Sequence, residues 1–531
     1  MDKEFPIEIW KQILSNLEKD QLKKCLLVSN EFRELIITTP ELMRKLQLIF
    51  FNENWKSKLP FIEKYGFYIR SIKFDDCGFR SMTDLKLILA MTPNVETLIF
   101  YNCFILDPTM ENGEREGQRH NGDAEDEPIE GIDYIVRNNI PDESHSEAEQ
   151  MAEDPEEDDP IDLKKLTHLH LDSCNIAEKL VRSLRNCTTL KSFKITFYYQ
   201  APVNFFTDFV CQQDNLQELN CVGWSDMVFK SLFKDDISRD RIKFKLKKFK
   251  LECELGYHEN FSKFLRSQAS HVTELELTCY NINFHYYRLL FNNFHRLKKL
   301  TLPTDWFLTD ERAADIKNCR IPTLKQLDLV GSNDDVATFK IVIDIFPNIE
   351  VLRAENIMYF SMHEILDKFT KLRHIKVENF RVESMLFVKL PSLKVLEISY
   401  LYPMALSFLW ENLSENCPNI EQLVIKDIGH FKLNESIKKE IGIIINNLAS
   451  FKNLKHCEIV SSPADPMVNG DEDHNELHHQ PLDHPFYKIL VDNYEDKPQA
   501  VIKLSQYISQ NCIEEINVLK ETFKKCDIVE I

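Results

Sequence analysis

The residues that could do chemistry are spread through the chain without the spacing that catalysis needs. Fourteen cysteines occur in 531 residues, and none form a C-x-x-C pair, which argues against zinc ribbons and thioredoxin-type sites. The sequence has no G-x-x-x-x-G-K-[ST], G-x-G-x-x-G or H-E-x-x-H motif. His363-Glu364 comes nearest to the last of these, but Asp367 stands where a second histidine is needed. The sequence therefore predicts no catalytic residues and no cofactor.

Residues 463–485 hold the densest group of possible metal ligands. Histidine-rich tracts can bind metal ions, but this one lies among Pro, Asp and Asn residues with no pattern of a packed scaffold. We therefore expect a polar linker here and no metal site. The histidines concerned are His474, His478, His479 and His484.

Charge and hydropathy exclude several classes of protein. The formal net charge is −20, which disfavours binding to nucleic acid through phosphate contacts. The charged start, Met-Asp-Lys-Glu, leads into no apolar run of signal length, and no stretch of about eighteen apolar residues could span a membrane. Together with free thiols, these features predict a protein of the cytoplasm, the nucleus or both, with no membrane contact.

A repeated pattern of apolar residues organises most of the chain. The pattern apolar-x-x-apolar-x-apolar, as in LTHLHL and LKVLEI, occurs fourteen times, mostly at intervals of 21 to 30 residues. Its last two apolar positions alternate with polar ones, as in a β-strand, and apolar residues between copies have helical spacing. Stacked copies share one core, so we expect an α/β fold with a parallel sheet and outer helices. The copies begin at Ile69, Val95, Leu166, Leu190, Leu216, Leu246, Val272, Leu297, Leu324, Ile349, Leu372, Leu393, Ile420 and Leu454.

Residues 107–161 interrupt the repeats. Val95 and Leu166 begin successive copies that lie 71 residues apart, and acidic residues dominate the segment between them. Such a composition cannot offset the entropy of ordering, so we expect a disordered acidic insertion within one repeat. It is either a solvated spacer or an acidic arm that competes for a basic partner.

The period and the strand pattern resemble those of leucine-rich-repeat proteins. Cys77, Cys103 and Cys174 stand two residues after the first three strands. The cysteine-type repeats of that superfamily place Cys or Asn at this point, where the side chain bonds the turn from inside; later copies hold other residues there. The resemblance implies a curved solenoid with a parallel β-sheet inside and helices outside.

The first forty residues carry a second motif. Ile9, Ile13 and Leu17 recur at helical spacing after Pro6, and Asp20 is placed to cap a following helix. The stretch FPIEIWKQILSNLEKDQLKKCLLVSNEFRELI resembles the F-box motif. The usual form of that motif is L-P-x-E-(I/L)-x-x-x-I-L-x-x-L-x-x-x-D-L, followed by V-(C/S)-(R/K)-x-(W/F)-R-x-L.

The F-box resemblance implies a partner. Phe5 replaces the usual leucine and Asn30 the usual basic residue, while the apolar positions keep their character. Forty residues rarely bury enough surface to fold alone, which implies docking onto another protein. In the family this is the Skp-family adaptor, which links the chain to the cullin and RING subunits of a ubiquitin ligase. The implied adaptor-binding residues are Phe5, Pro6, Ile9, Ile13, Leu14, Leu17, Leu22, Leu26, Val28, Ser29, Phe32 and Leu35.

The family also implies a role for the repeats. They would hold a protein substrate for ubiquitination and proteasomal degradation, and separate subunits would supply catalysis, so the chain itself is expected to be no enzyme. The alternative is a repeat scaffold that acts outside any ligase, with the N-terminal helices as a cap. The substrate-binding residues expected on the concave face are His168, His170, Lys194, Lys248, Lys250, Glu274, Glu276, Arg353, Glu355, His374 and Lys376.

These inferences predict an order of domains along the chain. A helical F-box precedes the solenoid, the acidic insertion falls inside the solenoid, and a helical segment ends the chain. The expected bounds are 1–45 for the F-box, 46–66 for linker helices, 67–462 for the leucine-rich-repeat solenoid, 463–485 for the polar linker and 486–531 for the C-terminal helical segment.

Overall fold

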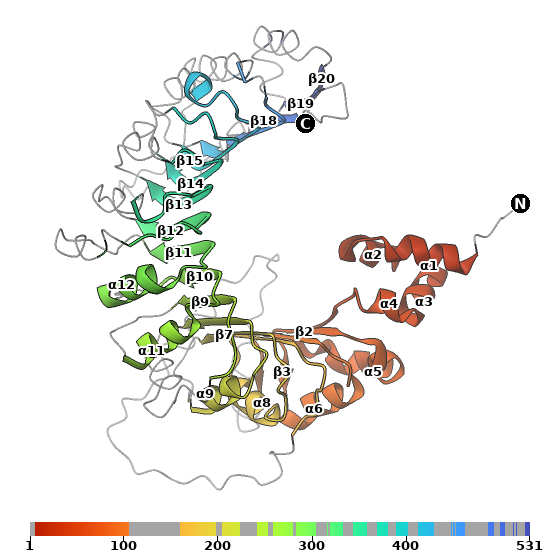
Figure 1. The fold of residues 1–531 in the computed structure, drawn as a ribbon. Helices are drawn as coiled ribbons and strands as arrows, with labels where there is room; N and C mark the ends of the chain where they lie inside the picture. Colours follow the sequence, from red (N-terminus) through yellow and green to blue (C-terminus); the bar gives the residue numbers. More distant parts are fainter. Residues whose placement is uncertain are drawn as a thin grey trace, which may run out of the picture. The chain divides into compact units, whose positions relative to one another are not determined.

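The chain divides into two compact units, Met1–Leu216 (unit 1) and Gln217–Ile531 (unit 2). The predicted acidic insertion lies outside the described residues except for positions 160 and 161, and the predicted linker 463–485 lies outside them entirely. The computed structural model, drawn in Figure 1, describes residues 6–105, 160–197, 204–223, 242–252, 259–279, 283–303, 316, 319–332, 344–357, 369–380, 389–401, 413–428, 448, 450–451, 453–461, 487–492, 500–504, 513, 517 and 526–530.

Unit 1 begins with four short helices. Pro6 precedes the first, where the missing N–H of proline costs the helix nothing. The second helix has Glu18 as its N-cap, in a reciprocal capping box with Gln21, so the prediction that Asp20 caps it was wrong. The helices are α1 (Ile7–Ser15), α2 (Lys19–Cys25), α3 (Asn30–Thr38) and α4 (Pro40–Met43).

A strand follows these helices where the sequence predicted only linker helices. Strand β1 (Leu48–Phe51) pairs in parallel with β2 (Ser71–Asp75). Both faces of β1 are apolar, with Ile49 and Phe51 turned outward, which hides the alternation that marks the other strands. Residues 52–66 are helical, as predicted, in η1 (Asn52–Lys58), α5 (Leu59–Tyr65) and the start of η2 (Gly66–Tyr68).

Parallel strands form the sheet of unit 1. Each of the first four copies of the repeat pattern lies on one of them, and within this unit the described pairings run in the order β1, β2, β4, β6, β7. Helices pack on one face of this sheet, and a second, small sheet joins β3 to β5. The bounds are β3 (Gly78–Phe79), α6 (Met82–Met91), β4 (Thr97–Tyr101), β5 (Phe104–Ile105), β6 (His168–Asp172), α8 (Ala177–Ser183), β7 (Ser192–Phe197) and α9 (Asn204–Cys211).

Aromatic side chains stack along the inner face of this sheet. Phe50, Phe74 and Phe100 occupy matching positions on three neighbouring strands and are all fully buried. The ring centroids lie 4.9 Å apart in the first pair and 4.8 Å apart in the second. Because the strand spacing of a sheet is close to this value, equal residues in successive repeats can stack continuously.

The cysteines after the first strands close the turns from inside, as the repeat resemblance implied. Cys77, Cys103 and Cys174 donate from Sγ to the carbonyl oxygen two residues earlier, at 3.4, 3.3 and 3.0 Å. The residue before each has a positive φ, for example 49° at Asn102. Polar residues such as Asn tolerate this left-handed backbone, so the turn type follows from its sequence.

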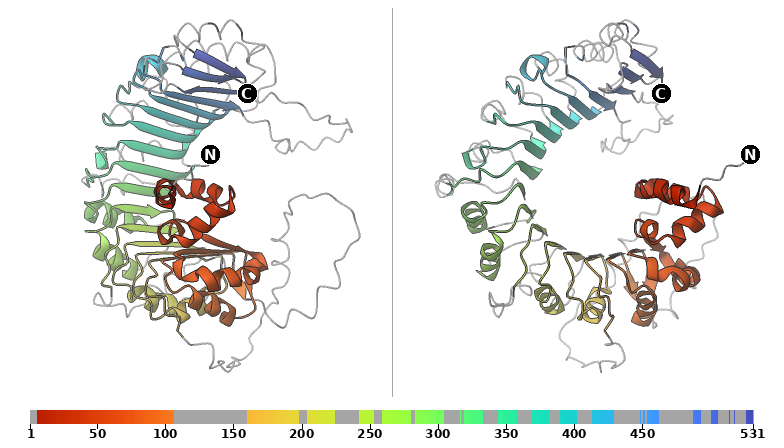
Figure 2. Two further views of the ribbon diagram at one scale, coloured as in Figure 1. Left: turned by 90° about the vertical axis from the view of Figure 1, so that its right-hand side faces the viewer. Right: turned by 45° about the vertical axis from the view of Figure 1, so that its right-hand side comes forward.

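Unit 2 contains the strands of the other ten copies of the repeat pattern, and each is parallel to the described strands of the adjacent repeats. Figure 2 shows these strands stacked side by side. The chain is therefore an α/β protein with long parallel sheets, as predicted. The strands are β8 (Glu218–Gly223), β9 (Lys248–Glu252), β10 (Glu274–Leu277), β11 (Lys299–Pro303), β12 (Gln326–Ser332), β13 (Val351–Ile357), β14 (His374–Phe380), β15 (Val395–Leu401), β16 (Gln422–Ile428) and β17 (His456–Ser461).

Two helices of unit 2 cover one side of its sheet, at α11 (Glu259–Gln268) and α12 (Phe284–Asn293). Phe261 on α11 is fully buried, and its ring centroid lies 5.1 Å from that of Tyr286 on α12. Aromatic contacts therefore tie neighbouring helices together as well as helix to sheet.

The C-terminal segment differs from the prediction of helices over 486–531. Its described stretches include three strands, β18 (Tyr487–Asp492), β19 (Ala500–Leu504) and β20 (Cys526–Glu530). Strand β18 pairs antiparallel with β17 and so extends the edge of the sheet. Short apolar runs such as YKILVD do not separate strand from helix by periodicity, and pairing with the sheet edge decided the outcome.

Candidate functional site

The N-terminal helices of unit 1 form a small cluster with its own core. Leu14, Leu22, Leu35, Ile36 and Leu42 are its buried members. The predicted residues Leu17, Leu26 and Phe32 pack against them from partly buried positions, as do Trp10, Cys25 and Leu46. The ring of Trp10 meets that of Phe32 edge to face at a centroid distance of 4.9 Å.

Polar contacts fix the chain path through this cluster. The N–H of Phe32 donates to the Ser29 hydroxyl at 3.1 Å, which caps α3. Lys45 donates from Nζ to the carbonyl oxygen of Ser15 at 2.5 Å and to that of Leu17 at 3.2 Å, so it bonds the end of α1. Ser29 therefore has a structural role as the N-cap of α3.

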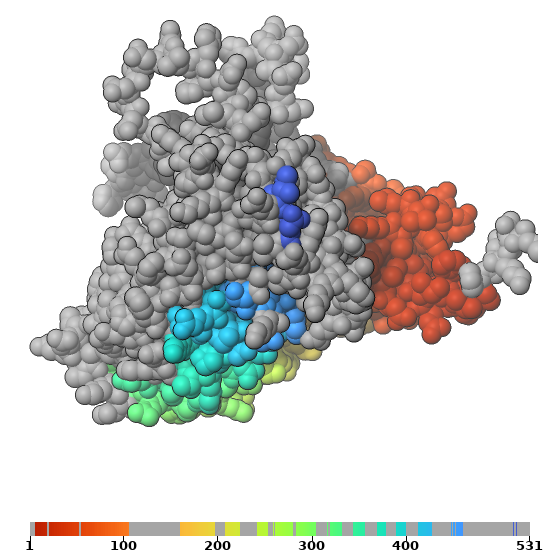
Figure 3. Space-filling model, turned by 90° about the horizontal axis from the view of Figure 1, so that it is seen from above, coloured from red at the N-terminus to blue at the C-terminus, as the bar shows by residue number. Residues whose placement is uncertain are grey.

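Large apolar side chains remain exposed on the same helices. Ile9 and Ile13, one turn apart on α1, are 39% and 43% exposed, and Val28 is 67% exposed. In the space-filling view of Figure 3, the N-terminal helices form the red surface. A cluster with a filled core and a second set of exposed apolar side chains has the character of a docking surface.

The predicted adaptor-binding residues thus fall into different environments. Leu14, Leu22 and Leu35 are buried, whereas Pro6, Ile9, Ile13 and Val28 are exposed; Phe5 lies outside the described residues. The sequence analysis missed Ile7 and Leu27, which are 54% and 81% exposed. The signal for Leu27 was present: three apolar residues, 26–28, follow α2 in a row, and a helix end can bury only some of them.

The second candidate site is the outward face of the strands. In unit 1, the predicted residues His168 and His170 lie on β6, and Lys194 lies beside His170 on β7. His168 is exposed, and His170 is half-buried with Nε2 4.0 Å from the carboxylate of Asp172. Burial lowers the pKa of His170 most, Asp172 opposes that shift, and Lys194 adds to it. The histidine is therefore held towards its neutral form.

In unit 2, opposite charges face each other across neighbouring strands. Lys248 lies opposite Glu274, and Lys250 lies opposite Glu276, in the register of β9 and β10. Lys248 Nζ is 2.9 Å from Glu274, and Lys250 forms an ion pair with Glu276. These four predicted residues pair with one another, and Lys250 also lies 3.7 Å from Glu252.

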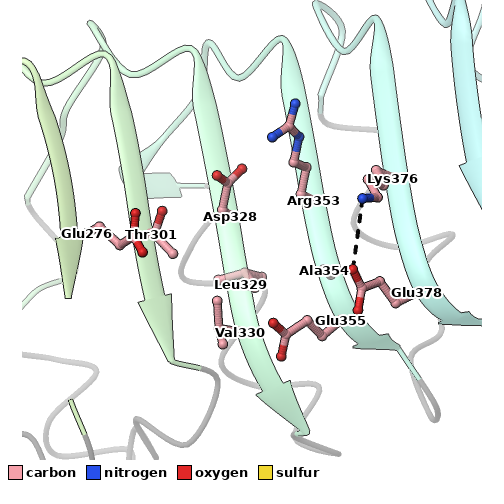
Figure 4. A pocket seen from close by; sticks show the side chains of 10 residues that line it. All are labelled: Glu276, Thr301, Asp328, Leu329, Val330, Arg353, Ala354, Glu355, Lys376 and Glu378. Carbon is pink, nitrogen blue, oxygen red and sulfur yellow. Dashed lines mark ion pairs between the residues drawn. The ribbon is translucent and has the colours of Figure 1, made fainter. Parts of the chain in front are cut away.

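A hollow of about 180 Å³ lies on the same face over β10–β14. Figure 4 shows Asp328, Arg353 and Glu355 projecting from neighbouring strands, and the ion pair of Lys376 with Glu378. The lining residues are Glu276, Thr301, Asp328, Leu329, Val330, Arg353, Ala354, Glu355, Lys376 and Glu378. Of the predicted substrate-binding residues, four line this hollow: Glu276, Arg353, Glu355 and Lys376. The hollow is also lined by residues that the sequence analysis did not name, among them Asp328, Thr301 and Glu378.

The carboxylates of this hollow already have partners. Asp328 pairs with Lys299 at 3.3 Å, and Glu355 accepts a hydrogen bond from the Gly331 N–H at 2.6 Å. Arg353 is exposed and forms no ion pair within the described part of the chain. Its guanidinium can donate hydrogen bonds to a carboxylate or a backbone carbonyl of a bound polypeptide.

His374 borders the hollow on β14. Its Nε2 lies 3.2 Å from Glu397 on β15. Burial lowers its pKa most, Arg353 and Lys376 lower it further, and Glu397 opposes them. The pKa of His374 therefore responds to charged groups on β13, β14 and β15.

Neither a metal centre nor a membrane span is found among the residues with a described structure. No three His, Cys, Asp or Glu side chains there are grouped to hold a metal ion, and no helix there has the length and apolar character to cross a bilayer. The chain matches no protein-family model, and no curated protein is similar to it.

Proposed function

We propose that this chain is a substrate-recognition subunit of an SCF-type cullin-RING ubiquitin ligase. Its N-terminal helices would act as an F-box that binds the Skp-family adaptor. Its repeats would act as a leucine-rich-repeat solenoid that binds a protein substrate. The chain would bring the target lysine near the activated ubiquitin, and the chemistry would belong to other subunits.

The observation that supports this proposal most directly is that the apolar residues of the N-terminal helices divide into a buried set and an exposed set. The motif positions Leu14, Leu22 and Leu35 fill the core, while Ile9, Ile13 and Val28 stay exposed. A helical cap for the repeats would have no need for these exposed apolar side chains. A docking helix pair needs them, because covering their exposed apolar surface on a partner contributes about 25 cal/mol per Å².

The repeat body supports the second half of the proposal. Fourteen strands lie at the predicted positions, and their outward faces carry charged and polar side chains. The hollow around Arg353 offers hydrogen-bonding groups on a sheet whose backbone is fixed by pairing on both sides. Such a surface suits a protein ligand, and the rigid sheet would hold it in a fixed orientation.

Copurification of the full chain with a Skp-family adaptor tests this function. We expect the wild type to bind and the double variant Ile9→Asp/Ile13→Asp to lose binding, since it places two charges on the docking helix. The matched control is Leu87→Asp, which puts a charge on an apolar side chain of α6 that is 50% exposed. Circular dichroism verifies that the three proteins keep their fold.

Two outcomes would contradict the proposal. A folded wild type that binds no adaptor would make the chain a capped repeat scaffold outside any ligase. Equal loss of binding in the Leu87→Asp control would show that the Ile9→Asp/Ile13→Asp effect is not specific to the docking helix.

A further inference from the structure

A row of charged residues runs along the edge of unit 2 where its strands begin. The row consists of the residue that follows the first apolar position of each repeat from the copy at Leu246 onward, and we name it the edge row. Six of its nine members are basic and two are acidic, although the whole chain carries a net charge of −20. The members are Lys247, Thr273, Lys298, Lys325, Glu350, Arg373, Lys394, Glu421 and Lys455.

Backbone hydrogen bonds make this row continuous. The N–H of each member from Thr273 onward donates to the carbonyl oxygen of the member before it, at 2.7 to 2.9 Å. Neighbouring strands lie about 4.8 Å apart, so nine members extend over roughly 38 Å. The basic side chains therefore share one line on the surface of unit 2.

The positive charge of the edge row is exposed and only partly neutralised. All six bases are exposed, and both acids are half-buried. Lys325 pairs with Glu350 at 2.6 Å, and Glu421 pairs with both Lys394 and Lys455. Lys247, Lys298 and Arg373 form no ion pair in the described portion of the chain, so the acids leave an excess of cations.

The turns that lead into the edge row add to its charge. The described residues within five positions before each member contain no Asp or Glu. Burial lowers the pKa of His271 in one of these turns, and the nearby cations Lys245 and Arg296 lower it further. The bases in these turns, all exposed, are Lys243, Lys245, Arg296, Arg320, Lys371 and Lys389.

Acidic residues gather at the opposite ends of the same strands. Glu252, Glu355 and Glu378 lie near the carboxyl ends of β9, β13 and β14. The outward face between these ends carries both signs, in pairs such as Lys248 with Glu274, so the excess of basic residues lies at the edge row and its turns. Charge complementarity at such a row would favour an acidic partner.

We propose that the edge row, with the cations of its turns, is a docking surface for an acidic segment of a partner protein. Its length fits about eleven residues of extended chain at about 3.4 Å each. A polypeptide fits better than a nucleic acid, because Glu350 and Glu421 stand within the row and the acids of the outward face lie next to it. A narrow acidic chain can follow the cations and avoid those acids, whereas the broad field of a duplex cannot. This inference is independent of the N-terminal helices and of the ligase proposal.

The test uses the full chain and a fluorescent twelve-residue peptide of alternating Glu and Ser, measured by fluorescence anisotropy at about 50 and 150 mM salt. We expect binding that weakens with salt and that weakens about tenfold in the triple variant Lys247→Gln/Lys298→Gln/Arg373→Gln. The matched control, Lys248→Gln/Lys299→Gln/Lys376→Gln, removes three cations from the outward face of the same three strands. We expect it to bind within about twofold of the wild type.

Each other outcome would overturn the proposal. Equal weakening in both triple variants would show only a response to net charge. If the wild-type chain does not bind the peptide at the lower salt concentration, the edge row is only a solvated surface. Tighter binding of a twelve-base-pair duplex than of the peptide would assign the row to nucleic acid. The Ile9→Asp/Ile13→Asp variant should bind the peptide normally, so a failed ligase assignment leaves this result intact.

Discussion

At the scale of single residues, His374 shows how neighbouring charges on the outward face shift the pKa of a side chain. It is half-buried on β14, with Arg353 on the neighbouring strand β13 and Glu397 on the neighbouring strand β15. Burial and Arg353 disfavour the imidazolium, and Glu397 favours it. Because the shift is downward, the folded chain binds a proton at His374 less readily than the unfolded chain does.

Titration of His374 by NMR tests this balance. We expect its pKa to lie below the usual value of about 6.5, to fall further in Glu397→Gln and to rise in Arg353→Gln. The unfolded chain takes up the proton first as pH falls, so this residue makes the fold less stable below about pH 6.5. The loss between pH 7.5 and 5.5 should therefore be smaller in His374→Gln. Unchanged titration in both neighbour variants would contradict the assignment of causes.

At Gly66 the surrounding backbone leaves no room for a side chain. A Cβ built there would lie 2.3 Å from the backbone carbonyl oxygen of Met91. The clash involves backbone at the end of α6, which cannot move aside as a flexible side chain can. We expect Gly66→Ala to cost about 1–3 kcal/mol and to lower the melting temperature. The control is Phe67→Ala, which removes an exposed side chain beside it; an equal loss in both would remove the steric argument.

At the scale of elements, buried glutamines join the end of a helix to the start of the strand that precedes that helix. Gln213 is fully buried, and its Nε2 donates to the carbonyl oxygens of Cys187 at 2.6 Å and Phe209 at 3.2 Å. Its Oε1 accepts a hydrogen bond from the Leu190 N–H at 3.3 Å. Gln268 in unit 2 likewise accepts from the Leu246 N–H, at 2.9 Å. One amide thus satisfies backbone groups of two successive repeats.

Replacing Gln213 should loosen this junction. Gln213→Leu keeps the volume but leaves the Leu190 N–H and the Cys187 carbonyl without their partner, at a cost of about 2 kcal/mol. The matched control, Gln212→Leu, changes the exposed neighbour and should cost less than about 0.5 kcal/mol. Hydrogen exchange at the Leu190 amide measures the difference directly, and equal rates in the two variants would contradict this role.

The elements also show what the sequence could predict. The fourteen apolar patterns located fourteen strands, because one buried face with period two is written directly into residues such as Leu169 and Leu171. The sequence pattern does not predict strand β1, because both faces of this strand are apolar. It predicts helices in place of β18–β20, because such short apolar runs fit a strand and a helix equally well. Sequence pattern thus predicts elements that bury one face better than elements fixed by pairing at an edge.

Part of the candidate surfaces was open to prediction and part was not. The motif named Ile9, Ile13 and Val28, which are exposed, but it could not separate them from Leu14, which is buried. The edge row needs the strand register, since its members lie more than twenty residues apart in sequence. Surfaces made from many repeats emerge only when neighbouring strands are aligned.

At the scale of the whole molecule, each unit is an array in which a strand pairs only with its neighbours. Strand β14 pairs with β13 and β15 among the described strands, and its Ile375 and Val377 are fully buried. In such an array, stability is a sum of local terms and contacts between adjacent repeats. A defect in one repeat should then spread to its neighbours and fade beyond them.

The variant Ile375→Ala tests this locality. The lost side chain leaves a cavity in the core of one repeat, so we expect a cost of about 2–5 kcal/mol. Hydrogen exchange should quicken in β13, β14 and β15, while β9 and β10 of the same unit and all of unit 1 keep their protection. The control is Val395→Ala, on the outward face of β15, which should leave exchange almost unchanged. Uniform loss of protection throughout the chain would mean that the repeats unfold as one block, and the array description would then be wrong.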